Sequence, residues 1–329
     1  MVNCLVLGAT GFIGGQIVRA ALARGWHVVG LRRRPDAIGD LADLTTVGRE
    51  DGMLTWRQGN LSDADSLAAA MQGCEIVFHC AGAYPHNPRT MDRDIGRAVR
   101  EMQNVLGAAR RAGITRLIYT SSYTTIGRPA EPGRLADERD FYVPGSSGDP
   151  YYEAKWAMEV EALRVAQTGL AVVVLCPTAV FGPGDVHLSV SGPLLLAARG
   201  RLPICPEATL GVIDVRDVAA AHIAAVERGR PGTRTILNAH NVTLYDVLAL
   251  AARLNGARPP RFRLGPRMLR VAAAIGQLAP GGQASFLKTV PLWQPVHNAR
   301  AVAELGLTTR PLAETLTDAL AWFRGRGLL

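Results

Sequence analysis

Lysine is the residue type that this chain most conspicuously lacks. Only two lysines, Lys155 and Lys288, stand beside 34 arginines in its 329 residues. Arginine can replace lysine on most surfaces. A lysine that is kept in a chain so rich in arginine is therefore a candidate for a role that a forked guanidinium cannot fill. Lys155 stands four residues after Tyr151, and chance predicts roughly 0.04 Tyr-x-x-x-Lys pairs at these frequencies. The pair is therefore the first candidate functional feature.

Other features are also missing. No apolar run reaches the roughly 18 residues that a membrane-spanning helix needs. The chain runs from Met1 straight into "VNCLVLGAT", which predicts no secretory signal. The five cysteines are odd in number, well separated and without metal-ligand spacing. We therefore expect reduced core thiols, no metal site and a cytoplasmic location.

The net charge of +8 raises the question of a nucleic-acid partner. The arginines are spread along the chain, aromatic residues make up only 6% of it, and no stretch alternates basic and aromatic side chains as base stacking requires. We expect a solvated, arginine-rich surface and no nucleic-acid partner, with "LRRRP" as the local exception.

The first half of the chain alternates apolar, β-branched runs with helical patterns. This alternation predicts an α/β fold, a Rossmann-type doubly wound parallel sheet covered on both faces. We expect a dinucleotide-binding domain over residues 1–180 and a smaller substrate lobe over 181–329, with segments that return to the core. Strands are expected at 3–8, 27–32, 54–58, 75–80, 116–121 and 171–177, and helices at 13–24, 63–71, 93–112, 150–168, 243–254 and 311–327.

The segment "LVLGATGFIGG" places Gly8, Gly11 and Gly14 between the first predicted strand and the first predicted helix. The first glycine permits a tight turn, the second lets the backbone approach a pyrophosphate, and the third lets helix and strand pack closely. The phosphates then meet the helix N-terminus, where free N–H groups favour anions. This position in a βαβ unit favours a dinucleotide site over a purely structural turn.

The end of the second predicted strand indicates which dinucleotide is bound. A site for NAD carries an acidic residue there, whereas this chain has Arg32, followed by Arg33 and Arg34. Guanidinium groups suit a 2′-phosphate, so NADP(H) is favoured; the alternative is that these are ordinary surface arginines. Asn60, near the end of the third strand, is a candidate adenine contact, and the small residues 81–83 can lie beside a ribose.

Tyr151 and Lys155 share one face of a predicted helix. A phenol is a poor acid–base group near neutral pH, but an adjacent ammonium stabilises the phenolate and lowers its pKa. Tyr152 is a competing candidate that we rank second, with packing as its alternative role. A hydroxyl to hold a substrate oxygen is available at 120–122, where "TSS" ends the fifth predicted strand at the edge at which such sheets bind ligands.

With these motifs in hand, the chain resembles an extended short-chain dehydrogenase/reductase over nearly its full length. It is similar to the branch of dihydroflavonol reductases and 3β-hydroxysteroid dehydrogenases, which includes hopanoid-associated epimerase-like proteins. The matching features are "GATGFIG", "YTSS", the Tyr151/Lys155 pair, "CPTAVFGPGD", "VIDVRDVAAAH" and "ELGLTTRPLAETLTDALAWF".

The resemblance implies that Tyr151 exchanges a proton with the substrate oxygen, that Lys155 tunes it and binds the nicotinamide ribose, and that Ser122 orients the oxygen. It also implies a homodimer. The expected cofactor contacts, from residues and resemblance together, are Gly8, Thr10, Gly11, Phe12, Ile13, Gly14, Arg32, Arg33, Asn60, Leu61, Ala81, Gly82, Ala83, Thr120, Tyr151, Lys155, Pro177, Thr178 and Val180.

Two positions depart from relatives. Many relatives have an asparagine where this chain has Ala98. A proton-relay water or a helix kink that depends on that asparagine is therefore not expected from this sequence. Sugar-nucleotide epimerases usually have an asparagine where this chain has Ala179. That loss argues against a nucleotide-sugar substrate, because diphosphate recognition needs polar groups.

The leading hypothesis is an NADP(H)-dependent oxidoreductase that interconverts a carbonyl and a secondary alcohol on a fairly apolar small molecule. The variable segments 84–94, 187–196 and 267–293 are expected to shape the pocket. One alternative is an epimerase or dehydratase of a sugar derivative with transient cofactor oxidation. Another is a non-enzymatic NADP-sensing or scaffold protein on the same fold.

Overall fold

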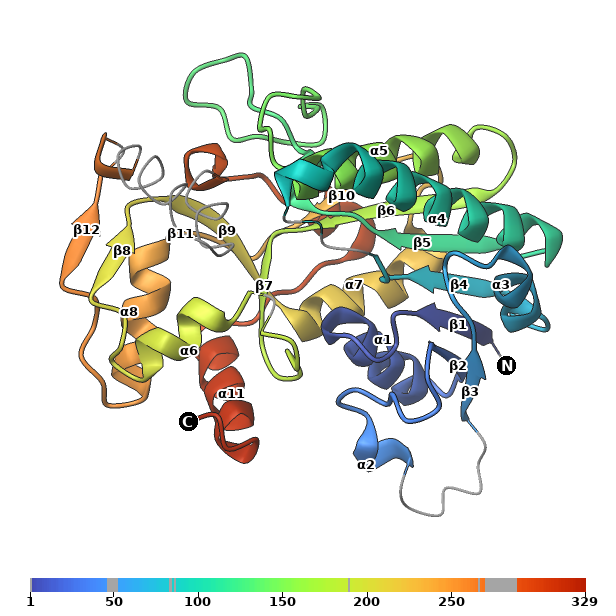
Figure 1. Cartoon of the computed structure of the whole chain (residues 1–329), viewed down its shortest axis with the longest axis horizontal. Coiled ribbons are helices and arrows are strands. Elements are labelled where there is room, and N and C mark those ends of the chain that lie inside the picture. Colours follow the sequence, from blue (N-terminus) through green and yellow to red (C-terminus); the bar gives the residue numbers. More distant parts are fainter. Residues whose placement is uncertain are drawn as a thin grey trace.

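A seven-stranded parallel sheet forms the centre of the protein (Figure 1). The computed structural model describes residues 2–45, 53–82, 85, 87–188, 190–265, 267–269 and 289–329. The strand order is β10-β6-β5-β4-β1-β2-β3, in which the chain reverses direction across the sheet between β1 and β4. The strands are β1 (Asn3–Leu7), β2 (His27–Arg32), β3 (Leu54–Gln58), β4 (Ile76–His79), β5 (Arg116–Thr120), β6 (Ala171–Pro177) and β10 (Arg234–Leu237).

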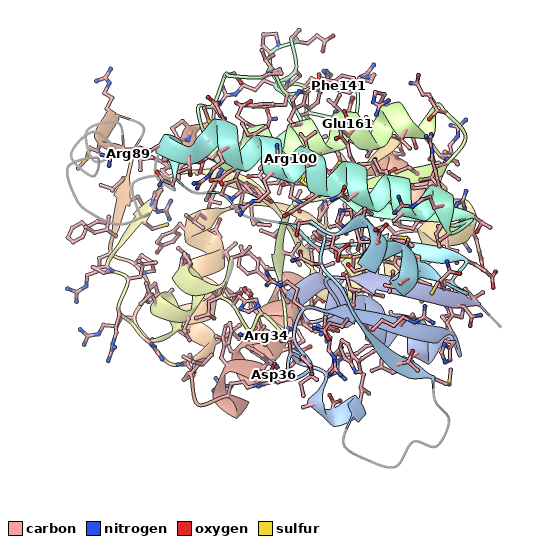
Figure 2. All side chains as sticks on the ribbon, turned by 45° about the vertical axis from the view of Figure 1, so that its right-hand side comes forward. Arg34, Asp36, Arg89, Arg100, Phe141 and Glu161 are labelled. Atoms are coloured by element: carbon pink, nitrogen blue, oxygen red, sulfur yellow. The ribbon has the colours of Figure 1, made fainter. Side chains whose placement is uncertain are left out.

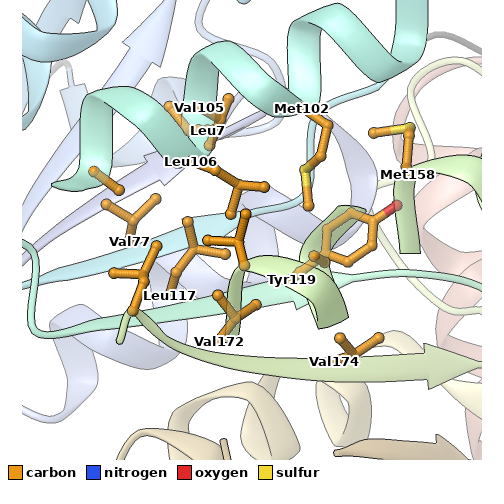
Figure 3. Packing of buried hydrophobic residues seen from close by; sticks show 14 of the residues in the cluster. Leu7, Val77, Met102, Val105, Leu106, Leu117, Tyr119, Met158, Val172 and Val174 are labelled. Carbon is orange, nitrogen blue, oxygen red and sulfur yellow. The ribbon is translucent and has the colours of Figure 1, made fainter. Parts of the chain in front are cut away.

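Helices cover both faces of this sheet, as the sequence predicts. Because side chains alternate along each strand, Leu5 and Leu7 face one layer and Cys4 and Val6 face the other. The first layer contains α3 (Ala64–Met71), α4 (Met91–Arg111) and α5 (Pro150–Ala166), and its packing on the sheet is shown in Figure 3. The second contains α1 (Phe12–Ala23) and α7 (Val215–Arg228). The short helix α2 (Ala42–Thr45) follows β2.

The sequence predicted the six strands of the first half and four of the five helices that the structure describes there to within two residues at each end, and missed the short helix α2. Their start signals are local: Asp63 accepts hydrogen bonds from the first N–H groups of α3, and Asp149 does the same for α5. Proline follows Asp149 at the first helical position, where its missing N–H costs nothing. Short 3-10 turns lie at Pro88–Thr90, Tyr123–Thr125 (η2) and Val290–Leu292, and a π-helical turn lies at Ala301–Leu305.

A smaller lobe packs around a third apolar cluster. Among the residues that the structure describes, it contains a sheet of order β11-β9-β7, a two-stranded pair of β12 and β8, and three helices. Its elements are β7 (Ala179–Phe181), α6 (Gly192–Ala198), β8 (Ile204–Pro206), β9 (Thr209–Asp214), β11 (His240–Thr243), α8 (Leu244–Leu254), β12 (Phe262–Leu264) and α11 (Leu312–Gly325).

Two elements of the second half belong to the main sheet rather than to this lobe. Strand β10 pairs in parallel with β6, and α7 packs against α1. The division at residue 180 stays a prediction, because the chain after it alternates between core and lobe. No strand was predicted at β10, because "RTIL" is too short to distinguish from a loop by its pattern.

Within the described ranges, no helix has the length and apolar character to cross a membrane. No group of three or more His, Cys, Asp and Glu side chains in those ranges is placed to hold a metal ion. The cysteines are free thiols, and four of the five are buried, as expected for core residues.

Candidate active site

The turn after β1 depends on glycine at two positions. Gly8 has a φ of +88°, and a Cβ on it would lie 2.9 Å from the backbone nitrogen of Ala81. A Cβ on Gly14 would lie 2.1 Å from the carbonyl oxygen of Gly8, so only glycine lets α1 start this close to β1. Gly11 is the N-cap of α1 and provides no capping side chain to its first N–H groups. This cradle fits the pyrophosphate of a dinucleotide. Thr10 completes the turn, and Phe12 and Ile13 also pack against the second core layer.

The strand β2 ends in arginine, with no carboxylate at that position. Arg32 is partly buried, and its guanidinium lies 5.3 Å from the ring centroid of Trp56. Arg33 is exposed, and Arg34 pairs at 3.7 Å with Asp36 on the surface (Figure 2). A 2′-phosphate beside β2 would therefore meet exposed positive charge.

The other expected adenosine contacts lie in the two neighbouring loops. The side-chain oxygen of Asn60 accepts a hydrogen bond from the backbone N–H of Ser62, which forms a turn after β3. The carbonyl of Leu61 accepts a hydrogen bond from Asn104 of α4. Ala81 lies directly beside Gly8, and Gly82 follows it. Ala83 lies outside the described residues, as does most of the segment 267–293 expected to shape the substrate pocket.

The first turn of α5 holds both candidate tyrosines in different surroundings. Tyr151 is half-buried, whereas Tyr152 is only 6% exposed and packs against the ring of Tyr142. Burial raises the pKa of Tyr152 far above its usual range, and the neighbouring Tyr123 adds to the rise. Burial thus disfavours the phenolate that Tyr152 would become on giving up its proton, and Tyr151 stays the first candidate.

Lys155 reaches from α5 to the end of β5. Its ammonium donates a hydrogen bond of 3.2 Å to the carbonyl oxygen of Thr120 and lies 5.6 Å from the ring centroid of Tyr119. Burial lowers the pKa of Lys155 to about 8, while Cys80, Cys176 and Glu159 oppose that shift. The scarce lysine is therefore a buried cation at the carboxyl edge of the sheet.

The two serines after β5 differ in what they contact. Ser122 is the N-cap of η2, and its hydroxyl accepts a hydrogen bond of 3.2 Å from the backbone N–H of Thr124. Ser121 instead donates to the carboxylate of Glu159. Because that carboxylate engages Ser121 in the interior, Ser122 is the better candidate for a substrate contact.

Sequence reasoning missed a buried ion pair behind these residues. Glu159 on α5 is fully buried and lies 3.3 Å from the guanidinium of Arg234 on β10, which is 3% exposed. The hydroxyl of Thr125 donates to Glu159 at 2.7 Å, and its carbonyl accepts from Arg234 at 2.7 Å. The spacing could have indicated Glu159, because it follows Lys155 by four residues, as Lys155 follows Tyr151, and so lies on the same face of the helix.

Two buried histidines next to this site are neutral near pH 7. Thr120 is hydrogen-bonded through its hydroxyl to His222 at 2.8 Å, and burial lowers the pKa of His222 to about 4. Burial lowers the pKa of His79 to about 3, with the charge of Lys155 as a second cause. Among the described residues, the His79 ring nitrogens have no hydrogen-bond partner. Neither histidine can serve as a cationic acid here.

The motif after β6 is largely packed inside the protein. Thr178 donates to the carbonyl of Leu237 at 3.2 Å, and Val180 is 4% exposed in the second core layer. Contact of Pro177, Thr178 and Val180 with a nicotinamide stays a prediction. Ala98 is a buried residue of α4, which runs unbroken from Met91 to Arg111.

Comparison with known proteins agrees with this architecture. Residues 4–239 match the family model described as the NAD dependent epimerase/dehydratase family. A Synechocystis sp. protein with the provisional name dihydroflavonol 4-reductase is 32% identical over 99% of this chain and 96% of its own. Cinnamoyl-CoA reductase 1 of Oryza sativa is 33% identical over 98% of this chain and 91% of its own. The solved structure of a nucleoside-diphosphate-sugar epimerase from Pseudomonas aeruginosa aligns with a TM-score of 0.83 at 26% identity, covering 100% of this chain and 99% of that one.

The chain belongs to the NAD dependent epimerase/dehydratase family, whose members are extended short-chain dehydrogenases/reductases. The predicted Rossmann fold and the resemblance to the dihydroflavonol reductase branch are confirmed. The protein is thus an enzyme of the NAD(P)-dependent reductase/epimerase family.

The glycine cradle can be tested with two alanine variants. Gly14→Ala forces a methyl group against the Gly8 carbonyl, so we expect a loss of about 1–3 kcal/mol in the free energy of unfolding and at least about tenfold weaker dinucleotide binding. Gly107→Ala is the matched control, because a Cβ at that position of α4 meets nothing within 4 Å. It should stabilise the helix by about 0.5–1 kcal/mol. Urea unfolding measures the stability of each variant, and a titration measures its affinity for the dinucleotide. Equal affinities of Gly14→Ala and Gly107→Ala would contradict a role of the glycine turn in dinucleotide binding.

The buried charge of Lys155 predicts a pH-dependent difference between the wild type and Lys155→Met. Below about pH 8 the lysine is protonated in the folded and unfolded chains, so the stability difference is constant. Above it, the folded chain releases the proton while the unfolded chain keeps it up to about pH 10.4, so the wild type gains stability relative to the variant.

Urea unfolding of both proteins at about pH 7 and about pH 9.5 should show that gain as roughly 2 kcal/mol. Thiol and phenol titrations occur in both proteins and cancel in the comparison. A stability difference that is the same at the two pH values would show that Lys155 is not a perturbed, buried cation.

Proposed function

We propose that this enzyme is an NADPH-dependent reductase of a carbonyl group on a fairly apolar small molecule, acting through Ser122, Tyr151 and Lys155. The observation that carries the proposal is the buried ammonium of Lys155, which is bonded to Thr120 at the carboxyl edge of the sheet, four residues along α5 from a half-buried tyrosine. The glycine turn after β1 lies at the same carboxyl edge. Ligands of open α/β sheets bind at that edge. The dihydroflavonol and cinnamoyl-CoA reductase names of two relatives support reduction.

In this proposal each side chain has one task. Tyr151 donates a proton to the carbonyl oxygen, and the ammonium of Lys155 stabilises the phenolate that remains. The hydroxyl of Ser122 donates a hydrogen bond to the same oxygen and fixes its direction. NADPH, when bound, supplies the hydride. Tyr152 takes no part, because burial disfavours the phenolate that proton donation would leave, and the two buried histidines are neutral and so have no cationic proton to give.

NADP(H) is proposed over NAD(H) because β2 ends in Arg32 and continues with Arg33. Two guanidinium groups favour a 2′-phosphate, and a carboxylate that would accept from a ribose hydroxyl is missing at that strand end. The cytoplasmic location and the homodimer stay predictions. For the dimer, the family resemblance indicates the exposed faces of α4 and α5, where Figure 2 labels Arg100 and Glu161.

A second candidate is epimerisation or dehydration of a sugar derivative, in which the sugar is transiently oxidised and the cofactor has no net turnover. The 26% identical sugar-nucleotide epimerase supports it, since that structure aligns over the whole chain. Ala179 argues against it, because an apolar methyl replaces the amide expected beside a nucleotide sugar. The two candidates share the cofactor and differ in whether NADPH is consumed.

The tyrosine pair gives a direct test. Tyr151→Phe should lower kcat/KM for NADPH-dependent reduction by about 10²–10⁴-fold, because the proton donor is lost while NADPH binding remains. Tyr152→Phe is the matched control and should lower kcat/KM by less than about threefold, since a buried phenol is a packing residue. NADPH oxidation followed by absorbance over a panel of apolar ketones and aldehydes measures both.

The same panel decides between the candidates. Conversion of a nucleotide sugar without net NADPH oxidation, together with no turnover of any apolar carbonyl, contradicts the reductase. NADPH binding without chemistry on either class of compound would favour a sensor or scaffold. A larger loss of kcat/KM in Tyr152→Phe than in Tyr151→Phe would show that Tyr152, and not Tyr151, donates the proton.

The cofactor preference can be tested at Arg33. Arg33→Gln should raise the Kd for NADPH by about tenfold or more and change the Kd for NADH by less than about twofold, because only the 2′-phosphate loses a charged partner. Arg24→Gln, at an exposed position after α1, is the control and should change neither. Wild-type protein that binds NADH more tightly than NADPH would contradict the preference.

A further inference from the structure

The two-stranded sheet of the smaller lobe has one apolar face turned outward. Strands β8 and β12 are parallel, with Phe262 opposite Ile204 and Arg263 opposite Cys205. Side chains alternate along a strand, so Cys205 and Arg263 share one face and their neighbours share the other. We call this second face, together with Met268 just beyond β12, the outer face; its strand residues are Ile204, Pro206, Phe262 and Leu264.

The inner face is occupied and the outer face is open. Cys205 is fully buried in the third apolar cluster, and the guanidinium of Arg263 lies 3.8 Å from the ring centroid of Tyr245 on α8. On the outer face Ile204 is 44% exposed, Phe262 63% and Met268 60%. Three large apolar side chains are therefore exposed on or just after this strand pair, where soluble surfaces usually carry polar groups.

Arginines lie close in sequence to the residues of this apolar face. Arg201, Arg261 and Arg267 are exposed, and none of them forms an ion pair within the described part of the chain. Glu207, directly after β8, is an exposed carboxylate nearby. The charge bias is also visible in the sequence: between Asp246 and Glu304 the chain has eight Lys or Arg and no acidic residue. At the chain's mean frequency of 28 acidic residues in 329, those 57 positions would hold about five.

We propose that the outer face of the β8–β12 sheet and its arginines dock on the surface of an anionic lipid bilayer. A few exposed apolar side chains with basic residues next to them in the chain match the boundary between acyl chains and negatively charged headgroups. A second copy of this chain is a poor partner for the same patch, because like charges would face each other. Nucleic acid would satisfy the arginines but leave Ile204 and Met268 without contacts.

The location of the patch is compatible with docking. Figure 1 shows β8 and β12 at the end of the molecule remote from the N-terminal strands of the main sheet. A bilayer at that end would contact the smaller lobe and leave the cofactor edge accessible. The proposal concerns association with lipid alone, and it stands or falls independently of the reaction proposed above.

Vesicle sedimentation of the full chain tests the proposal. Binding is expected to phosphatidylcholine vesicles that contain roughly 30% phosphatidylglycerol, with little binding to pure phosphatidylcholine, and it should be lost in about 0.5 M salt. Arg261→Gln with Arg267→Gln should lower the partition coefficient about fivefold for each arginine removed. Phe262→Ser with Met268→Ser should lower it at least about tenfold.

A matched control changes the same residue types elsewhere. Val143 is 66% exposed and Arg24 is exposed, so Val143→Ser with Arg24→Gln should leave vesicle binding unchanged. Unchanged urea midpoints in all three double variants show that folding is intact. The proposal is overturned by no binding to anionic vesicles, by equal binding to neutral ones, or by patch variants that behave like the control. Binding of DNA or polyglutamate in place of vesicles also overturns it.

Discussion

A buried carboxylate on α5, the helix that carries Tyr151 and Lys155, needs a buried cation, and that pairing organises this protein. Glu159 and Arg234 are both excluded from water and lie 3.3 Å apart. One belongs to α5 and the other to β10, a strand that reaches the sheet only after the chain has built half of the smaller lobe. Removing either partner would leave an unpaired buried charge, which typically costs about 3–5 kcal/mol. The pair therefore couples folding of the second half to the position of α5.

The same carboxylate connects this pair to the candidate active site. Glu159 accepts hydrogen bonds from Ser121 and Thr125, and these two residues flank Ser122 on either side of the turn. One helix thereby fixes Tyr151 and Lys155 and also anchors the loop that offers the third candidate side chain. Burial destabilises the charged form of Lys155, and the Thr120 carbonyl and the carboxylate partly offset that cost. A lysine in these surroundings can change protonation near physiological pH.

The chain passes between the smaller lobe and the main domain more than once. Helix α7 closes one face of the sheet and β10 extends its edge, so the lobe is attached by several crossings rather than by one linker. Between these crossings lie the strands of the β8–β12 sheet and the exposed arginines next to them. Variation of the lobe can therefore change substrate or surface partners without disturbing the cofactor cradle.

The sequence alone determined the features that rest on local chemistry. Alternating apolar runs, the glycine turn, the Asp149 cap and the spacing of Tyr151 and Lys155 each follow from neighbouring residues, and the fold and family they predict are confirmed. Tertiary structure decided what depends on distant partners. Only packing shows that Tyr152 is buried, that Glu159 meets Arg234 across 75 positions of chain, and that "RTIL" completes the sheet. Spacing along one strand or helix cannot encode a contact between two segments, because burial and charge pairing arise where those segments meet.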